Sequence, residues 1–144
     1  MNPQYIILHH SLTKDSETVS WGAIRRYHTQ DMGWKDIGYH YGIELIGDYN
    51  EILVGRLMNQ NGAHCKEQSM NSKSLGVCFV GNFDEEKPNS TIWEKGVRLV
   101  SSLCEILRIS TDNIYGHRDF ASYKSCPGKL FNIEKFKRDV RKNL

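Results

Sequence analysis

Three features of this 144-residue sequence carry side chains of types that bind a transition-metal ion, and they lie at or just after the ends of predicted strands. The pair His9-His10 follows the apolar run Tyr5–Leu8, and His117 follows a second short apolar segment. Cys126 comes nine residues after His117. Imidazole and thiolate are preferred zinc ligands, and two histidines with one cysteine leave the fourth tetrahedral position open. The pattern therefore favours a catalytic zinc site over a closed structural one.

The spacing of these residues leaves other interpretations open. The sequence has no Cys-x-x-Cys or His-Glu-x-x-His signature, so the spacing alone is a weak signal for a metal. Cys126 and His117 could instead act as nucleophile and general base, which would leave His9 without a role. Each histidine could also be an ordinary core or surface residue.

The elements that must position these residues are predicted from hydrophobic periodicity. Apolar runs predict strands at 5–8, 75–80 and 113–116, and alternation predicts a hairpin at 42–55 with Asp48-Tyr49-Asn50 at its turn. Helical spacing predicts helices at 21–29, 91–107 and 133–144, and Thr91 with Glu94 forms a capping-box pattern. We therefore expect a mixed α/β fold, a single domain over 1–144. Its central mixed β-sheet is flanked by α-helices, with the zinc site at the strand ends.

Composition narrows the classes of protein. Apolar residues make up 39% of the chain and charged residues 25%, which is typical of a globular domain. The net charge of +2 and the scattered Lys and Arg residues give no argument for nucleic-acid binding. No apolar run approaches the roughly 20 residues that a membrane span needs. Residues 1–10 lack the pattern of a secretory signal, so we expect the chain to be cytoplasmic as synthesised.

The four cysteines are expected to be free. Disulfides are rare in reducing compartments, and no secretory signal is visible. Cys78 lies in an apolar strand and Cys104 on an apolar helical face, so both are predicted to be small core residues.

Four segments, in this order, resemble the motifs of the type 2 N-acetylmuramoyl-L-alanine amidases. This family includes the bacteriophage lysozyme-type amidases and the peptidoglycan recognition proteins. The matching segments are 7–11 (ILHHS), 33–41 (GWKDIGYHY), 71–81 (NSKSLGVCFVG) and 116–119 (GHRD) with 124–127 (KSCP). The resemblance runs from about residue 5 to 131, and four ordered motifs are far more specific than any one of them.

The resemblance implies a role for each matched residue. His9, His117 and Cys126 match the family's zinc ligands, which implies one zinc ion per chain. Tyr39 matches its catalytic tyrosine, and Lys124, two residues before the ligand cysteine, matches its catalytic lysine. Packing for Tyr39 and a solvated loop position for Lys124 are the alternatives. The segment between His117 and Cys126 is one residue longer than in the phage relatives.

Two further histidines are candidate substrate-binding residues. His64 resembles a family position at the rim of the groove, where it would contact glycan or peptide, and a plain surface histidine is the alternative. His40 follows the matched tyrosine. Its alternative roles are a buried hydrogen-bond donor and a support for a ligand.

The resemblance implies a function: zinc-dependent hydrolysis of the amide bond between N-acetylmuramic acid and L-alanine in peptidoglycan. The protein would be a phage or prophage endolysin that reaches the cell wall after release, and we expect a monomer. The alternatives are a bacterial recycling or remodelling amidase, a cysteine hydrolase, and a module that binds peptidoglycan without cutting it. Family members of this last kind have lost the cysteine ligand, whereas Cys126 is present here.

Overall fold

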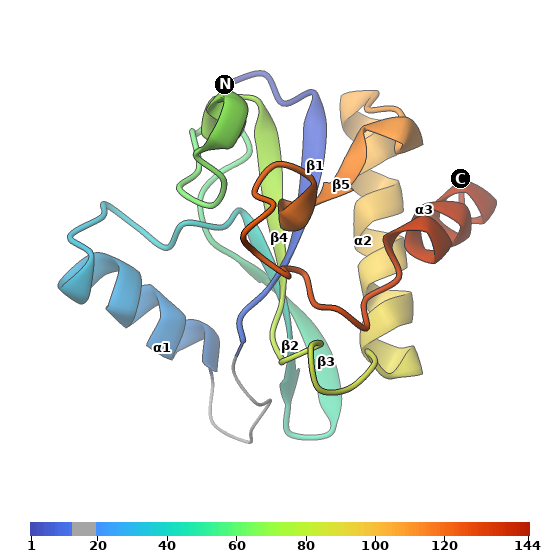
Figure 1. Cartoon of the computed structure of the whole chain (residues 1–144), viewed down its shortest axis with the longest axis horizontal. Coiled ribbons are helices and arrows are strands. Elements are labelled where there is room, and N and C mark those ends of the chain that lie inside the picture. Colours follow the sequence, from blue (N-terminus) through green and yellow to red (C-terminus); the bar gives the residue numbers. More distant parts are fainter. Residues whose placement is uncertain (13–19) are drawn as a thin grey trace.

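A five-stranded mixed β-sheet forms the centre of the computed structural model, which describes residues 1–12 and 20–144 (Figure 1). The strands lie in the order β3-β2-β4-β1-β5. Strand β1 pairs in parallel with β4 and β5, β2 pairs in parallel with β4, and β3 runs antiparallel to β2. Their bounds are Tyr5–His10 (β1), Tyr41–Ile46 (β2), Tyr49–Val54 (β3), Ser74–Phe79 (β4) and Ile114–Gly116 (β5). The predicted fold class is confirmed.

The hairpin lies where the alternation predicts it, but the predicted turn is wrong. The turn residues are Gly47 and Asp48, while Tyr49 and Asn50 already pair with β2 in the strand β3. Gly47 has a φ of 62°, in the left-handed region that a residue without Cβ adopts at no steric cost. A two-residue hairpin turn requires a residue with positive φ, so the turn forms at Gly47.

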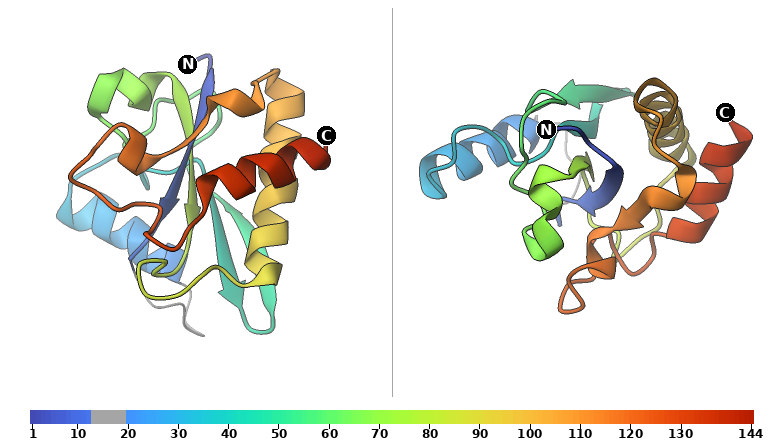
Figure 2. Two further views of the ribbon diagram at one scale, coloured as in Figure 1. Left: turned by 45° about the vertical axis from the view of Figure 1, so that its right-hand side comes forward. Right: turned by 90° about the horizontal axis from the view of Figure 1, so that it is seen from above.

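Helices cover both faces of the sheet (Figures 1 and 2). Helix α1 (Ser20–Arg26) continues as a π-helical segment, Tyr27–Asp31, and lies on one side. Helices α2 (Ser90–Leu107) and α3 (Ile133–Lys142) lie against each other on the opposite side. The three helices correspond to the predicted ones. None of the helices in the described parts of the chain is long and apolar enough to cross a membrane.

The cap of α2 differs from the prediction. The cap residue is Asn89, whose side chain accepts a hydrogen bond from the backbone N–H of Ile92. Thr91 lies inside the helix, and its hydroxyl donates to the Asn89 side chain. Asn is as strong a cap residue as Ser or Thr, so the helix begins earlier than the capping-box pattern indicates.

Side chains of the central strands alternate between two cores, and this alternation decides which face carries the chemistry. Ile6 and Leu8 of β1 belong to the large core beneath α2 and α3. The other core lies beside α1 and contains Trp21, together with Cys78 of β4. Residues of opposite parity point to opposite faces of a strand, so His9 lies on the α1 side, where it pairs in register with Cys78.

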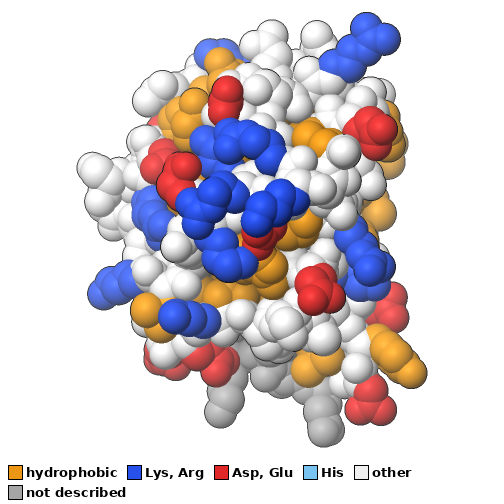
Figure 3. All heavy atoms as spheres, turned by 90° about the vertical axis from the view of Figure 1, so that its right-hand side faces the viewer, with side chains coloured by type: hydrophobic (Ala, Val, Ile, Leu, Met, Phe, Trp, Pro, Cys, Tyr) orange, Lys and Arg blue, Asp and Glu red, His pale blue; other side chains and the backbone are white. Residues whose placement is uncertain are grey.

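The outer face of the α2 and α3 layer carries a concentration of Lys and Arg side chains, with acidic side chains among them (Figure 3). This gathering departs from the even scatter expected from the sequence. Part of its charge is neutralised, because Lys135 pairs with Asp139 at 2.6 Å and Arg141 pairs with Asp112 at 2.7 Å.

Short 3-10 helices complete the described chain, and the sequence analysis did not predict them. They are Glu67–Ser72, Thr111–Asn113 and His117–Asp119. Pieces this short carry too few residues for a periodic pattern to be visible. The first and the last of them each contribute a side chain to the site described next.

Candidate metal centre

Strand register brings His9 and His117 side by side. Leu8 of β1 pairs with Gly116, the last residue of β5, so the next residue of each strand lies at the same edge of the sheet. Neighbouring strands lie about 4.8 Å apart. The ring centroids of His9 and His117 are 4.8 Å apart, and both side chains are buried.

The loop that carries Cys126 is held by Arg118, the residue after His117. The backbone N–H of Arg118 donates to the Cys126 carbonyl oxygen at 2.8 Å. Its guanidinium donates to the carbonyl oxygens of Ser125, Gly128 and Phe131. One rigid, five-donor cation therefore fixes the loop on both sides of the cysteine. The peptide bond between Cys126 and Pro127 is cis.

Asp84 holds the same loop from the opposite side. Its carboxylate accepts hydrogen bonds from the Ser125 hydroxyl and from the backbone N–H of Lys129, both at 2.8 Å. These bonds stabilise the charged form, and they hold the pKa of Asp84 below its usual value, with the Lys129 N–H contributing most. The cysteine loop is thus tied to the chain just beyond β4.

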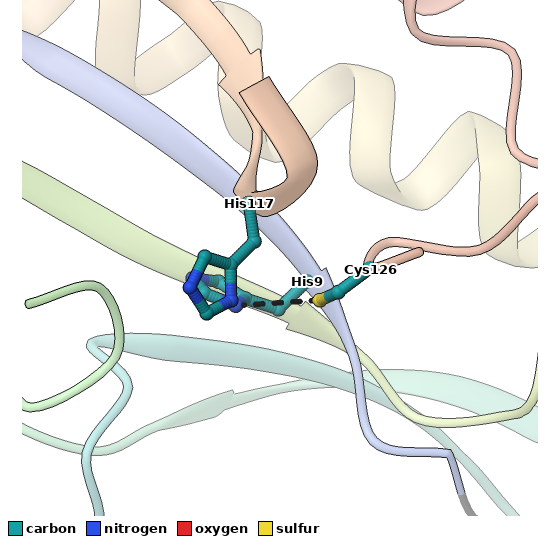
Figure 4. Close-up of side chains that lie close together, drawn as sticks. All are labelled: His9, His117 and Cys126. Carbon is teal, nitrogen blue, oxygen red and sulfur yellow. Dashed lines mark hydrogen bonds between the residues drawn. The ribbon is translucent and has the colours of Figure 1, made fainter. Parts of the chain in front are cut away.

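His9, His117 and Cys126 converge on one point (Figure 4), and they are a buried group that could bind a metal ion. One ligand atom from each lies within 4.8 Å of the others. The Cys126 Sγ is 3.5 Å from His9 Nδ1. A sulfur at about 2.3 Å and a nitrogen at about 2.0 Å from one tetrahedral zinc ion lie about 3.5 Å apart. The donor set and this spacing fit zinc.

His64 lies behind His9. Its Nδ1 is 2.9 Å from His9 Nε2, and its own Nε2 is 3.4 Å from the carbonyl oxygen of Ser74. Burial is the main cause that lowers the pKa of His64 to about 3, so the ring is neutral at neutral pH. A neutral His64 that donates to Ser74 accepts the proton of His9 Nε2. This leaves His9 Nδ1, the atom nearest Cys126, as an unprotonated ligand.

Glu67 lies behind His117. Its Oε2 is 3.4 Å from His117 Nε2 and 3.5 Å from Cys65 Sγ, and its Oε1 accepts a hydrogen bond from the Tyr123 hydroxyl. Burial opposes ionisation of Glu67, but hydrogen bonds, led by the one from Tyr123, outweigh it and lower its pKa to about 2. Glu67 is therefore a carboxylate at neutral pH. Cys65, Glu67 and His117 also form a second group with metal-binding geometry.

Burial favours the neutral form of both candidate histidine ligands. Desolvation is the largest cause that lowers the pKa of His9 and of His117. Glu67 opposes this effect at His117, whereas the positive charge of Lys124 lowers the pKa of both histidines further. A neutral imidazole is the form that binds a metal. Lys124 itself is exposed, and its Nζ lies 5.8 Å from the Tyr123 ring centroid. The ammonium group is thus placed at the rim of the site.

Tyr39 lines the site next to His9. Its ring centroid is 5.1 Å from that of His9 and 6.1 Å from that of Trp21. Burial, with the nearby Cys78 and Cys126, raises the pKa of Tyr39 well above its usual value. The phenol therefore stays protonated and can donate a hydrogen bond.

The substrate contacts expected for His40 and His64 do not fit their positions. His40 is fully buried, its Nδ1 accepts from the Gly76 N–H at 3.0 Å, and its Nε2 is 2.8 Å from the Gln60 carbonyl oxygen. This is the alternative role of a buried hydrogen-bonding histidine. His64 is 8% exposed and lies under His9, so it is a support for that residue instead of a rim residue.

The cysteine-nucleophile alternative has little support in the geometry. Among the described residues, the side chain that lies within hydrogen-bond distance of Cys126 Sγ is that of His9, and not that of His117, the expected base. Burial raises the pKa of the Cys126 thiol to about 11, so without a cation the thiol is not a reactive thiolate. Cys78 and Cys104 are buried core residues, as predicted, and all four cysteines are free.

Sequence reasoning missed four residues that build this site: Arg118, Asp84, Glu67 and Gly76. A Cβ on Gly76 would lie 2.6 Å from His64 Cγ, so only glycine leaves room for that ring. Arg118 and Gly76 lie inside the matched motifs, which was a usable signal. Asp84 and Glu67 lie in polar stretches that carry no periodic pattern.

Comparison with known proteins identifies relatives in animals and in phages. Peptidoglycan-recognition protein SC2 of Drosophila melanogaster is 34% identical over 130 residues, which cover 86% of this chain and 67% of that protein. The endolysin of Klebsiella phage KP32 is 33% identical over 125 residues, covering 85% of this chain and 78% of the endolysin.

Solved structures share the fold over nearly the whole chain. The N-acetylmuramoyl-L-alanine amidase LysC from Clostridium intestinale URNW superposes with a TM-score of 0.81 at 27% identity, covering 97% of this chain and 86% of LysC. Drosophila PGRP-LB superposes with a TM-score of 0.77 at 30% identity, covering 91% of this chain and 79% of PGRP-LB. The family model described as N-acetylmuramoyl-L-alanine amidase matches residues 1–129. With its His-His-Cys group, its five-stranded sheet and these relatives, the chain belongs to the N-acetylmuramoyl-L-alanine amidase family.

Proposed function

We propose that this protein is a zinc-dependent amidase that hydrolyses the bond between N-acetylmuramic acid and L-alanine in peptidoglycan. The observation that carries the proposal is the convergence of His9, His117 and Cys126. Three protein ligands leave one tetrahedral position open for water or substrate, which is the arrangement of a catalytic zinc site.

His9 Nδ1, Cys126 Sγ and the Nδ1 of His117 would hold the zinc ion. The Nε2 atoms of His9 and His117 face His64 and Glu67, which leaves the Nδ1 atoms for the metal. When bound, zinc supplies Lewis acidity that makes water a nucleophile at neutral pH, since it can lower the pKa of water from 15.7 to about 7.

Tyr39 and Lys124 act on the amide itself. Attack on the carbonyl carbon moves negative charge onto the carbonyl oxygen. The Lys124 ammonium at the rim can stabilise this charge. The protonated phenol of Tyr39, beside His9, can orient the attacking water or transfer a proton.

Relatives support peptidoglycan as the substrate. The structure of a Drosophila PGRP-LB variant is a complex with tracheal cytotoxin. PGRP-LE is likewise described in complex with tracheal cytotoxin, a monomeric diaminopimelic acid-type peptidoglycan. The phage relatives are endolysins. This favours a role as a phage or prophage endolysin, made in the cytoplasm and acting on the wall after release.

The test is digestion of purified peptidoglycan, with mass analysis of the products and zinc analysis of the protein. We expect about one zinc ion per chain and release of stem peptides with a free amino-terminal L-alanine. His9→Ala, His117→Ala and Cys126→Ser should each remove zinc and activity. Full activity of the zinc-free protein would overturn the proposal.

The same assay separates cutting from binding. A module that only binds peptidoglycan would sediment with cell walls and release no peptide, even when loaded with zinc. New reducing sugar ends without free amino-terminal alanine would assign the protein to the sugar-cutting enzymes instead. Such enzymes use a pair of carboxylates, whereas the group that carries this proposal consists of two histidines and one cysteine.

A further inference from the structure

The carboxylate of Glu67 lies beside His117 and has no role in the proposed set of ligands, His9, His117 and Cys126. Glu67 begins the 3-10 segment that leads into β4, far in sequence from the ligand it approaches. Its Oε2 lies 3.4 Å from His117 Nε2, and both side chains are largely buried. The contact joins residues that are 50 positions apart, so the tertiary fold alone creates it.

The chemistry of a histidine ligand explains why a carboxylate at this place matters. One ring nitrogen must be unprotonated to bind a metal ion, so the proton of the neutral ring stays on the other. In His117 it is Nε2 that faces Glu67 Oε2, so a metal ion on Nδ1 would leave the proton on Nε2, beside the carboxylate. A carboxylate that accepts this proton in a hydrogen bond fixes the tautomer, orients the ring and raises its basicity.

We infer that Glu67 is a positioning residue that holds His117 in its metal-binding tautomer and orientation. The inference rests on the proposed function, because it needs His117 to be a ligand. Glu67 is outside the group formed by His9, His117 and Cys126, and it acts through the imidazole of His117.

The two histidine ligands then have partners of different strength. His9 is backed by the neutral ring of His64, whereas His117 is backed by a full negative charge. Hydrogen bonds to ionised acceptors are roughly twice as strong as those between neutral groups. Loss of Glu67 should therefore weaken metal binding at least as much as loss of His64.

Tyr123 and Cys65 hold the carboxylate in place. The Tyr123 hydroxyl donates to Oε1, and the Cys65 thiol lies 3.5 Å from Oε2. Tyr123 lies on the loop between His117 and Cys126, and its side chain is 70% exposed. Its hydrogen bond thus connects the loop of the ligand cysteine to the segment that carries Glu67.

The test compares zinc affinity in Glu67→Ala, Glu67→Gln and Tyr123→Phe with that of the unchanged protein, by competition with a chromogenic chelator. Glu105→Ala, which removes an exposed carboxylate on α2, is the matched control. Unfolding of each metal-free protein in denaturant measures stability separately. Absorption spectra of the cobalt-substituted proteins report whether the ligand set is unchanged.

We expect Glu67→Ala to bind zinc about 10–100-fold more weakly, with a cobalt spectrum that still shows thiolate ligation. Glu67→Gln should lose less zinc affinity, because its amide oxygen can still accept a hydrogen bond from His117 Nε2. Tyr123→Phe should lose the least zinc affinity of the three variants, and Glu105→Ala should lose none. If Glu67→Ala does not fold, the graded effect of the other two variants decides the question.

Three results would overturn the inference or its basis. Unchanged zinc affinity in both Glu67 variants, with only the metal-free stability lowered, would make Glu67 a purely structural residue. Loss of zinc as complete as in His9→Ala, with an altered cobalt spectrum, would make Glu67 a ligand in the alternative group with Cys65 and His117. If the protein without substitutions binds no zinc, this result would instead refute the proposed function.

Discussion

The Nδ1 atom of His64 lies 2.9 Å from the Nε2 atom of His9, and the two rings meet edge to face at 88°. A chain of polar contacts therefore runs from the metal-binding point through His9 and His64 to the carbonyl oxygen of Ser74. The Ser74 carbonyl oxygen accepts the proton of His64 Nε2, and His64 Nδ1 in turn accepts the proton of His9 Nε2. This arrangement makes a buried, neutral histidine part of the candidate metal centre although it is not among the three candidate ligands.

Replacement of His64 by Ala should weaken zinc binding about 10–100-fold, because His9 then loses the acceptor that fixes its tautomer. Chelator competition measures the affinity. His28→Ala is the control, since its Nδ1 accepts a hydrogen bond from the Gly38 N–H and supports no ligand. Equal zinc affinity of the His64 variant and the unchanged protein would show that the contact does not act on the metal.

Gly76→Ala should displace His64, because the new Cβ would lie 2.6 Å from its Cγ. Overpacking of this kind costs about 1–3 kcal/mol in unfolding free energy. Zinc affinity should fall with it. Gly96→Ala is a matched control, since its Cβ would lie 2.4 Å from the Phe79 ring on the opposite face of the sheet. That variant should lose stability but keep its zinc affinity, and equal zinc affinities in both variants would contradict the prediction.

Tyr39→Phe and Lys124→Ala should keep zinc and fold but lower the turnover of peptidoglycan roughly 100-fold or more, since both groups are proposed to act on the transition state. Zinc analysis beside each rate distinguishes a catalytic defect from a lost metal. Lys129→Ala, an exposed lysine on the same loop, is the control for Lys124. Near-normal rates in both variants would show that Tyr39 has a packing role and that Lys124 is a solvated loop residue.

The thiols should differ in their reaction with an alkylating agent. A zinc-bound Cys126 thiolate resists alkylation while the metal is present and becomes accessible after chelation. Cys78 and Cys104 are buried, so both should resist in either state while the fold holds. Mass analysis of peptides identifies the modified residue. Rapid alkylation of Cys126 in the zinc-loaded protein would argue against ligation.

Acid should remove the stabilising effect of Asp84. The folded-state pKa of Asp84 lies below its usual value, which is about 3.9 in an unfolded chain. Its contribution is therefore complete above that value and disappears as the pH falls through the folded-state pKa. Denaturant unfolding of the metal-free Asp84→Asn variant should show lower stability than the unchanged protein at neutral pH.

The difference in unfolding free energy between the Asp84→Asn variant and the unchanged protein should shrink as the pH falls from about 5 towards 2. The metal-free form is used because protonation of the ligands would otherwise release zinc in the same range. Asn retains an acceptor for the Lys129 N–H, so the comparison isolates the charge. A stability difference that does not change with pH would contradict the assignment.

Local pattern was sufficient for most of the elements, and the resemblance of the four motifs supplied the three candidate ligands. The apolar run at β1, the hairpin and the amphipathic α2 follow from side-chain periodicity, because each element buries one face or both. The predictions of the hairpin turn and of the α2 cap were wrong, because the turn lies at Gly47 and the cap residue is Asn89. Several neighbouring residues could each serve a turn or a cap, and small differences in backbone geometry decide among them.

The sequence by itself determined the family, the mixed sheet and the three candidate metal ligands, because the motifs and the periodicity of the strands can be recognised along the chain without the fold. Only the tertiary structure decided which groups stand behind those side chains. His64 and Glu67 lie 55 and 50 residues from the ligands they contact, and no periodic pattern relates them. Their roles depend on burial and hydrogen-bond geometry, which exist only once the β1, β4 and β5 strands and their loops have packed together.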